Sequence, residues 1–146
     1  MIYYLIIITA AAIDRVLKYF INTNMSPGET KPLLGDFVDL TYVRNNGAAF
    51  SILQDHRILL IALPAILIAV GLVYVTRHRK DRSNFMLTSL SLVIAGGLGN
   101  LIDRVMTGYV IDFIDFRFWP VFNFADICVT VGCVLLCIYV VFLDKN

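Results

Sequence analysis

Charged residues are scarce in this chain of 146 residues. Only 16% of the residues are Asp, Glu, Lys or Arg, against about 25% in typical soluble domains. The 12 basic and 11 acidic side chains leave a net charge of +1, so no basic field favours nucleic acid and we predict no nucleic-acid partner. Hydrophobic residues make up 59% of the sequence, which is more than one small domain can bury in water. The composition therefore argues against a soluble enzyme and favours a small integral membrane protein.

Cysteine is rare as well. The three cysteines, Cys128, Cys133 and Cys137, lie in one apolar stretch without CxxC spacing. An odd count without that spacing argues against a disulfide framework and against a zinc site. No HExxH motif is present either, so a zinc protease has no motif to support it. We therefore predict neither a metal nor a cofactor, and we interpret the thiols as small buried hydrophobic groups.

Long apolar segments predict four membrane-spanning helices. They lie at about residues 2–21, 58–76, 84–104 and 122–143. The last three contain charge-free runs that approach the ~20 residues needed to cross ~30 Å of hydrocarbon. The predicted fold class is thus an all-α integral membrane protein, with residues 1–146 forming a single domain.

The first apolar segment has a competing interpretation as a signal peptide. A signal peptide carries basic residues before its apolar run and small residues at the cleavage site after it. Here no basic residue precedes the run, and Asp14, Arg15 and Lys18 follow it. We therefore interpret the segment as a retained helix.

Basic residues in the short connections predict the orientation in the membrane. Residues 77–82 include four Lys or Arg side chains in six positions, and such loops stay on the cytoplasmic side. Both termini are then cytoplasmic. The longer connections, at about residues 22–57 and 105–121, lie on the outer side.

The two outer loops have the composition of strands. Residues 37–43 and 109–119 are rich in Val, Ile, Tyr, Phe and Thr, which suit a pleated sheet. Ser-Pro-Gly at 26–28 and Lys-Pro at 31–32 are turn signals. We expect the two loops to form a small extracytoplasmic β-element on the membrane surface, with Trp119 in the interfacial aromatic belt.

Polar side chains gather at one depth of the predicted bundle. At 1.5 Å per residue, the polar positions of three helices fall in the outer half of the bilayer, and Asp112 lies on the outer loop just before the fourth helix. Ionisable groups in a bilayer are costly and pair with one another or line a functional cavity. The helical positions are Asp14, Lys18, Asn100, Asp103, Arg104, Asn123 and Asp126.

Several of these features also have structural interpretations. Asp14 and Lys18 have the i,i+4 spacing of a simple salt bridge, and Asp103 sits at a helix end where interfacial charges are ordinary. The glycines at 96, 97 and 99 resemble part of a phosphate loop, but no lysine follows them. We interpret them as sites of close helix packing.

Asp112 and Asp126 are harder to explain structurally, because Asp126 interrupts an apolar run. Two carboxylates held close together do not both ionise easily, so one keeps a proton. Such a pair supplies a base for water and an acid for an amide. Spacing alone leaves two alternatives open: a proton- or ion-coupled transporter, in which Asp14, Lys18 and Asp126 relay protons, and a non-catalytic assembly subunit.

Four sequence blocks then point to a family. Residues 42–51 read Tyr-Val-Arg-Asn-Asn-Gly-Ala-Ala-Phe-Ser, residues 99–104 read Gly-Asn-Leu-Ile-Asp-Arg, residues 110–114 read Val-Ile-Asp-Phe-Ile, and residues 122–126 read Phe-Asn-Phe-Ala-Asp. In order and spacing they resemble the signature blocks of lipoprotein signal peptidase, also called signal peptidase II. That family consists of bacterial intramembrane aspartic peptidases that cut prolipoproteins just before a diacylglyceryl-modified cysteine.

The resemblance implies a set of roles for this chain. The catalytic aspartates would be Asp112 and Asp126. It also implies a prolipoprotein substrate, contact with membrane lipid, a monomer, and a place in the bacterial cytoplasmic (inner) membrane with the active site toward the outer face. The supporting polar residues would be Asp14, Lys18, Asn45, Asn100, Arg104 and Asn123.

Two further expectations concern particular segments. Residues 45–51 are expected to close over the substrate, and Arg104 to buttress the outer loop. The first-helix motif of the family usually reads Asp-Gln-x-Ser/Thr-Lys, whereas residues 14–18 here read Asp-Arg-Val-Leu-Lys. Both charged ends of the motif are kept, and the departure is confined to its middle positions.

Overall fold

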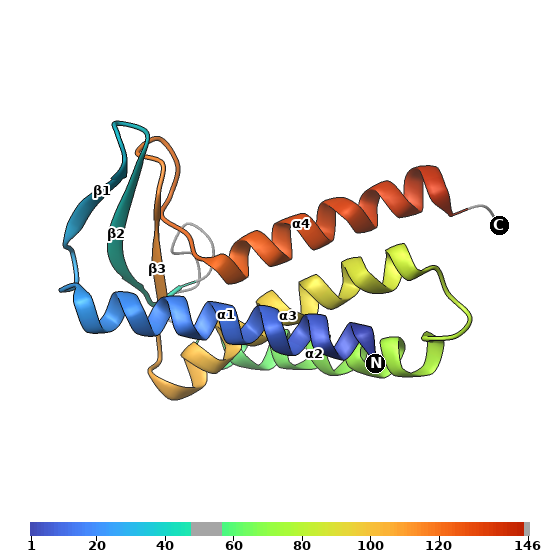
Figure 1. Cartoon of the computed structure of the whole chain (residues 1–146). Coiled ribbons are helices and arrows are strands. Elements are labelled where there is room, and N and C mark those ends of the chain that lie inside the picture. The colour runs from blue at the N-terminus through green and yellow to red at the C-terminus, as the bar shows by residue number, and fades with distance from the viewer. Residues whose placement is uncertain (48–56, 145–146) are drawn as a thin grey trace.

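The computed structural model describes residues 1–47 and 57–144, and Figure 1 shows its arrangement. Helices run along one direction, and a small sheet stands across one end of them (Figure 1). The helices are α1 (Ile2–Asn24), α2 (Arg57–His78), α3 (Asn84–Met106) and α4 (Phe124–Ile138), and α4 continues as the short π-helix η2 (Tyr139–Leu143).

Three helical segments are long and apolar enough to cross a membrane: α2, α3, and α4 together with η2. Their outward-facing side chains are largely aliphatic and exposed, as lipid-facing surfaces are. Helix α1 is as long as α3, at 23 residues, but Asp14, Arg15 and Lys18 interrupt its apolar sequence. Its span therefore stays a prediction.

Helix α3 occupies the centre and packs against α1, α2 and α4. Small residues permit its close approach to α4: a Cβ added at Gly96 would overlap the carbonyl oxygen of Ala125, and one at Gly132 would lie 2.7 Å from the carbonyl oxygen of Ser89. At Gly99 the space is taken by the Asp14 carboxylate. The packing interpretation is confirmed at Gly96 and Gly99. Gly97 faces Ile68 of α2 at ordinary contact distance.

The two predicted outer loops join in one antiparallel sheet of order β1-β2-β3. Strands β1 (Thr30–Leu34) and β2 (Val38–Asn45) come from the first loop, and β3 (Val110–Asp115) comes from the second. The expected β-element is therefore confirmed, with two corrections. Lys31 and Pro32 lie within β1 rather than in a turn, because an edge strand tolerates a residue without an N–H group. The strand expected at 109–119 ends at Asp115.

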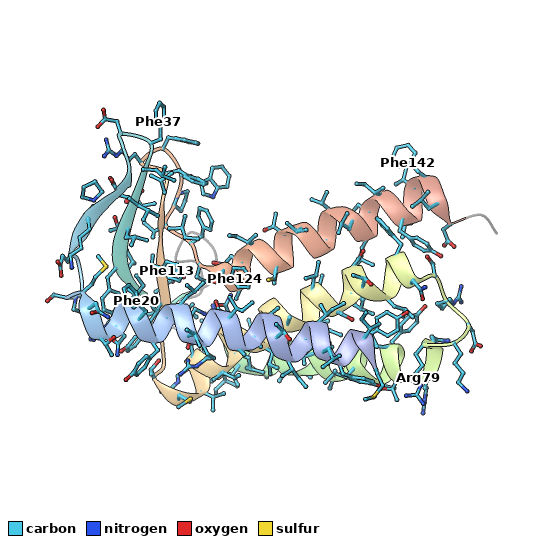
Figure 2. All side chains as sticks on the ribbon, viewed as in Figure 1. Phe20, Phe37, Arg79, Phe113, Phe124 and Phe142 are labelled. Carbon is cyan, nitrogen blue, oxygen red and sulfur yellow. The ribbon has the colours of Figure 1, made fainter. Side chains whose placement is uncertain are left out.

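A hydrophobic cluster fixes the sheet to the helix ends. Ile21 and Met25 at the end of α1 pack with Tyr42 of β2 and with Ile111 and Phe113 of β3. Figure 2 shows Phe113 and Phe124 where the sheet meets the helices, Phe37 at the tip of the β1–β2 turn, and Arg79 at the opposite end of the molecule. The N-terminus and the end of α4 lie at that opposite end too (Figure 1).

Helix α4 begins two residues later than the sequence suggested, at Phe124. Asn123 caps it: its side chain accepts a hydrogen bond from the Asp126 N–H at 2.9 Å, and the Asp126 carboxylate accepts one from the Asn123 N–H at 3.2 Å. This reciprocal capping box satisfies two amide groups that a helix start leaves without partners. It also fixes Asp126 in the first turn, beside the sheet.

Candidate active site

Asp112 sits on β3, opposite Val43 of β2 and two strand positions from Asn45. Only 3% of its surface is exposed. Its Oδ2 accepts a hydrogen bond from the Asn45 Nδ2 at 2.9 Å, and its Oδ1 accepts one from the Asn123 Nδ2 at 2.6 Å. The two amides therefore hold both oxygens of this carboxylate in place.

Asp126 approaches from the first turn of α4. Its Oδ1 accepts a hydrogen bond from the Asn100 Nδ2 at 2.7 Å, while Oδ2 takes part in the capping box. Asn123 also donates to the Asn100 Oδ1 at 3.2 Å. The two carboxylates are thus joined through a bridge of two amides, Asn123 on Asp112 and Asn100 on Asp126.

A buried ammonium group anchors this bridge. The Lys18 Nζ forms ion pairs with the Asp14 Oδ2 at 2.8 Å and the Asp103 Oδ2 at 2.9 Å. It also donates a hydrogen bond to the Asn100 Oδ1 at 2.9 Å. Asp14 in turn accepts from the Ala125 N–H at 2.9 Å, which ties α1 to the start of α4. The i,i+4 salt bridge expected from the sequence is confirmed, and it belongs to a larger network.

Arg15 occupies the position where the sequence departs from the expected motif. Its guanidinium forms an ion pair with the Asp103 carboxylate, which Lys18 contacts from the other side. Asp103 is 1% exposed, so two cations surround a buried carboxylate. The structural interpretation of Asp103 agrees with these contacts.

Arg104 joins the site to the first outer loop. Its Nη2 donates to the Gly47 carbonyl oxygen at 2.9 Å, and the Asn45 Oδ1 accepts from the Gly47 N–H at 2.9 Å. The expectation that Arg104 buttresses the outer loop is therefore confirmed at Gly47. Of the expected covering segment at 45–51, residues 48–51 lie outside the described residues.

Burial changes the acidity of Asp112. The pKa of Asp112 rises from 3.8 to about 6, and the largest cause is the loss of water around the buried carboxyl. The negative charge of Asp126 contributes to this rise, and the hydrogen bonds from Asn45 and Asn123 oppose it. A carboxyl with this pKa exchanges its proton near neutral pH, as a general acid or base must.

The carboxylates of the cluster outnumber its cations by one. Four carboxylates would carry −4 if all were ionised, and three cations carry +3. The carboxylates are Asp14, Asp103, Asp112 and Asp126, and the cations are Arg15, Lys18 and Arg104.

A cavity of about 690 Å³ opens above the two carboxylates, within the usual size range of ligand sites. Its polar end is formed by Asp112, Asp126, Asn45, Asn100 and Arg104. Its remaining walls are apolar except for Thr130. They come from the β3–α4 connection (Phe116, Phe118, Trp119, Pro120, Val121 and Phe122), from Val110, and from α4 (Ile127, Val129, Thr130 and Val131).

The structure brings all eight sequence-predicted site residues into one connected cluster. Sequence reasoning missed the contact of Arg15 with Asp103 and the aromatic wall of the cavity. The density of Phe and Trp between 113 and 122 was the available signal for that wall. Within residues 1–47 and 57–144, no three His, Cys, Asp or Glu side chains are arranged to hold a metal ion.

Comparison with known proteins gives a consistent result. The chain is 42% identical over 137 residues to the lipoprotein signal peptidase of Halothermothrix orenii, covering 93% of this chain and 92% of that protein. It is 41% identical over 148 residues to the lipoprotein signal peptidase of Clostridioides difficile, covering 100% of this chain and 99% of that one.

Two solved structures share the fold. Both are described as bacterial membrane enzyme structures obtained by the in meso method. One, at 2.3 Å resolution, has a TM-score of 0.88 and 35% identity over 99% of this chain and 93% of that one. The other, at 1.9 Å, has a TM-score of 0.85 and 38% identity over 98% and 94%. A family model described as signal peptidase (SPase) II matches residues 6–142. The chain therefore belongs to the signal peptidase II family of peptidases.

Proposed function

We propose that this protein is a membrane aspartic endopeptidase that removes the signal peptide from diacylglyceryl-modified prolipoproteins, cutting before the lipidated cysteine. The curated relatives named above are lipoprotein signal peptidases, which supports the substrate class. One observation carries the aspartic mechanism: Asp112 and Asp126 lie at the polar end of the cavity and are joined through Asn123 and Asn100.

In this mechanism the two carboxyl groups share one proton. The ionised carboxylate removes a proton from water, and the water oxygen attacks the scissile carbonyl carbon. The protonated carboxyl donates a hydrogen bond to the carbonyl oxygen, and a proton is then passed to the leaving amine. We assign the proton of the active form to Asp112, because burial raises the pKa of that carboxyl to about 6 and a fraction of the molecules therefore carries this proton near neutral pH. No covalent intermediate is needed.

The supporting residues orient the two carboxylates. Lys18 can only donate hydrogen bonds, so the Asn100 Oδ1 must face Lys18 and the Asn100 Nδ2 must face Asp126. The ammonium group thereby selects the amide orientation that holds the Asp126 carboxylate. The side-chain amides of Asn45 and Asn123 hold the Asp112 carboxylate by donating to its two oxygens.

We further propose four spans, with α1 crossing beside α3, and an orientation that places the basic loop at 77–82 in the cytoplasm and the sheet outside. This is the topology of a bacterial cytoplasmic membrane protein that acts as a monomer on substrates at the outer face, with lipid against its exposed helix faces. Labelling with an impermeant thiol reagent in intact cells tests it. In a cysteine-free background, Asp36→Cys should react and Arg79→Cys should not, and the reverse pattern would refute the orientation.

The transporter interpretation finds less support. Transport needs polar groups along a path across the bilayer. Away from the sheet, the buried hydroxyls of Ser89 and Ser91 donate to carbonyl oxygens of their own helix, at 2.8 Å and 2.7 Å. Such bonds commit both hydroxyl protons to the backbone of α3, so these two side chains do not extend the polar cluster toward the far end of the helices.

The substrate class is tested with the purified protein and two forms of one prolipoprotein, with and without the diacylglyceryl group. We expect cleavage of the lipidated form only, with mass spectrometry locating the cut immediately before the modified cysteine. Equal cleavage of both forms, or a cut elsewhere in the chain, would refute the proposed specificity.

A further inference from the structure

One wall of the cavity is a short aromatic segment, two of whose side chains are largely exposed. Residues 116–119, here called the aromatic loop, follow β3, and three of their four side chains line the cavity. Phe118 is 84% exposed and Trp119 is 56% exposed. Phe116 packs on Phe122, with ring centroids 5.2 Å apart. In Figure 1 the connection starts beside the β1–β2 turn and descends on the α4 side of the sheet.

The fourth side chain of the aromatic loop points the other way and ties the loop to the sheet. Arg117 donates from Nε to the Asp39 Oδ2 at 2.8 Å and from Nη2 to the Asp39 Oδ1 at 3.0 Å. This is the two-pronged geometry that gives arginine–carboxylate pairs their directional strength. The backbone N–H of Arg117 also donates to the Asp115 Oδ1 at 2.7 Å. Asp36 adds a longer ion pair at 3.7 Å.

The pairing of β2 with β3 places two carboxylates side by side, and a cation between them reduces their repulsion. Asp39 and Asp115 are directly opposed on β2 and β3, and like charges in that position repel. The Arg117 guanidinium holds the pKa of Asp39 below its usual value, so the carboxylate stays charged and paired. Arg117 achieves this in a left-handed conformation, with φ of 63°, which a residue with a side chain adopts only when other contacts favour it.

We propose that Arg117 is a positioning residue: its pair with Asp39 holds the aromatic loop against the cavity and thereby sets how tightly the apolar part of the substrate next to the scissile bond is bound. This inference rests on the proposed peptidase function. Arg117 does not line the cavity, so it acts through Phe116, Phe118 and Trp119. Asp112 and Asp126 are held by separate amides, so the chemical step does not depend on this pair.

Steady-state kinetics with the lipidated prolipoprotein test the division of roles. Arg117→Asn removes the ion pair with a residue that tolerates the left-handed conformation. We expect KM to rise about tenfold with kcat within twofold of the original, the pattern of a binding contact that is the same in ground and transition states. Asp39→Asn should behave in the same way. The reversed pair Arg117→Asp with Asp39→Arg should recover most of the loss in KM.

A matched control exists in the same sheet. Lys31 and Glu29 form an exposed pair at 3.0 Å that does not line the cavity, so Glu29→Gln should leave KM unchanged. An unchanged KM in Arg117→Asn and Asp39→Asn, or a fall in kcat without a change in KM, would overturn the proposal. So would a reversed pair no better than the single variants.

A second readout does not depend on activity. Trp119 is the only tryptophan in the chain, so intrinsic fluorescence reports on the aromatic loop directly. Quenching by acrylamide should increase in Arg117→Asn and Asp39→Asn without substrate, and it should match the original protein in Glu29→Gln. Identical quenching in all four proteins would refute the positioning role. If the unaltered protein fails to cut the lipidated substrate, the proposed function fails, while the quenching result still decides whether Arg117 holds the loop.

Discussion

Replacing Asp112 by Asn should change the pH dependence of stability as well as abolish activity. Burial raises the pKa of Asp112 from 3.8 to about 6, so the folded protein holds this proton more tightly than the unfolded chain does. A tenfold change in proton affinity is worth about 1.4 kcal/mol, so the ionised carboxylate costs the folded state about 3 kcal/mol at pH 7. That cost is absent below about pH 4. It grows as the pH rises toward 6 and is complete above about pH 7.

The assay is thermal unfolding of the detergent-solubilised protein between pH 4 and pH 8. The original protein should lose several degrees of Tm across this range relative to Asp112→Asn, which has no proton to release at this position. Asp126→Asn provides a graded control, because removing its charge lowers the pKa of Asp112 and should reduce the loss without eliminating it. Parallel Tm curves for the original protein and Asp112→Asn would refute the argument that burial perturbs this carboxyl.

The buried ion network and the helix contacts give two further predictions. Lys18→Met leaves Asp14 without its cation and should cost about 3–5 kcal/mol of stability. Adding Asp14→Asn should restore part of that stability in a thermal melt. A double variant no more stable than Lys18→Met alone would contradict the pairing. Gly96→Ala should destabilise the protein strongly, because the added methyl group would overlap the Ala125 carbonyl oxygen. The methyl group of Gly97→Ala meets only Ile68 at 3.4 Å, so this variant should melt close to the original protein. Equal Tm values for the two variants would exclude close α3–α4 packing.

Sequence alone predicted the helices well, because a run of about 20 apolar residues without charge is typical of a helix that crosses a membrane. It located the candidate site for a related reason: costly polar groups such as Asp126 stand out against an apolar background. Composition also indicated the strands that became β2 and β3. The start of α4 was misplaced because Phe122 is apolar, whereas the helix boundary is set by the capping side chain of Asn123.

What the sequence did not provide are contacts between distant segments. Arg15 and Asp103 are 88 positions apart, and nothing local to either residue indicates that they pair. Arg117 and Asp39 are 78 positions apart and meet only because β2 and β3 pair in one register. Strand β1 was missed because Pro32 suggested a turn, although proline is compatible with an edge strand.

The central claim is that Asp112 and Asp126 act as one catalytic unit, and its most direct test is the rate of cleavage of a lipidated prolipoprotein by Asp112→Asn, Asp126→Asn and the double variant. Each single change keeps the side-chain shape and removes proton exchange. We expect both to abolish cleavage in folded protein, and the double variant to be no worse than either, because groups that share one proton do not contribute independently. Asp103→Asn, which alters a buried carboxylate outside the pair, should reduce activity only as far as it reduces stability. Near-normal turnover by Asp112→Asn or Asp126→Asn would contradict the account.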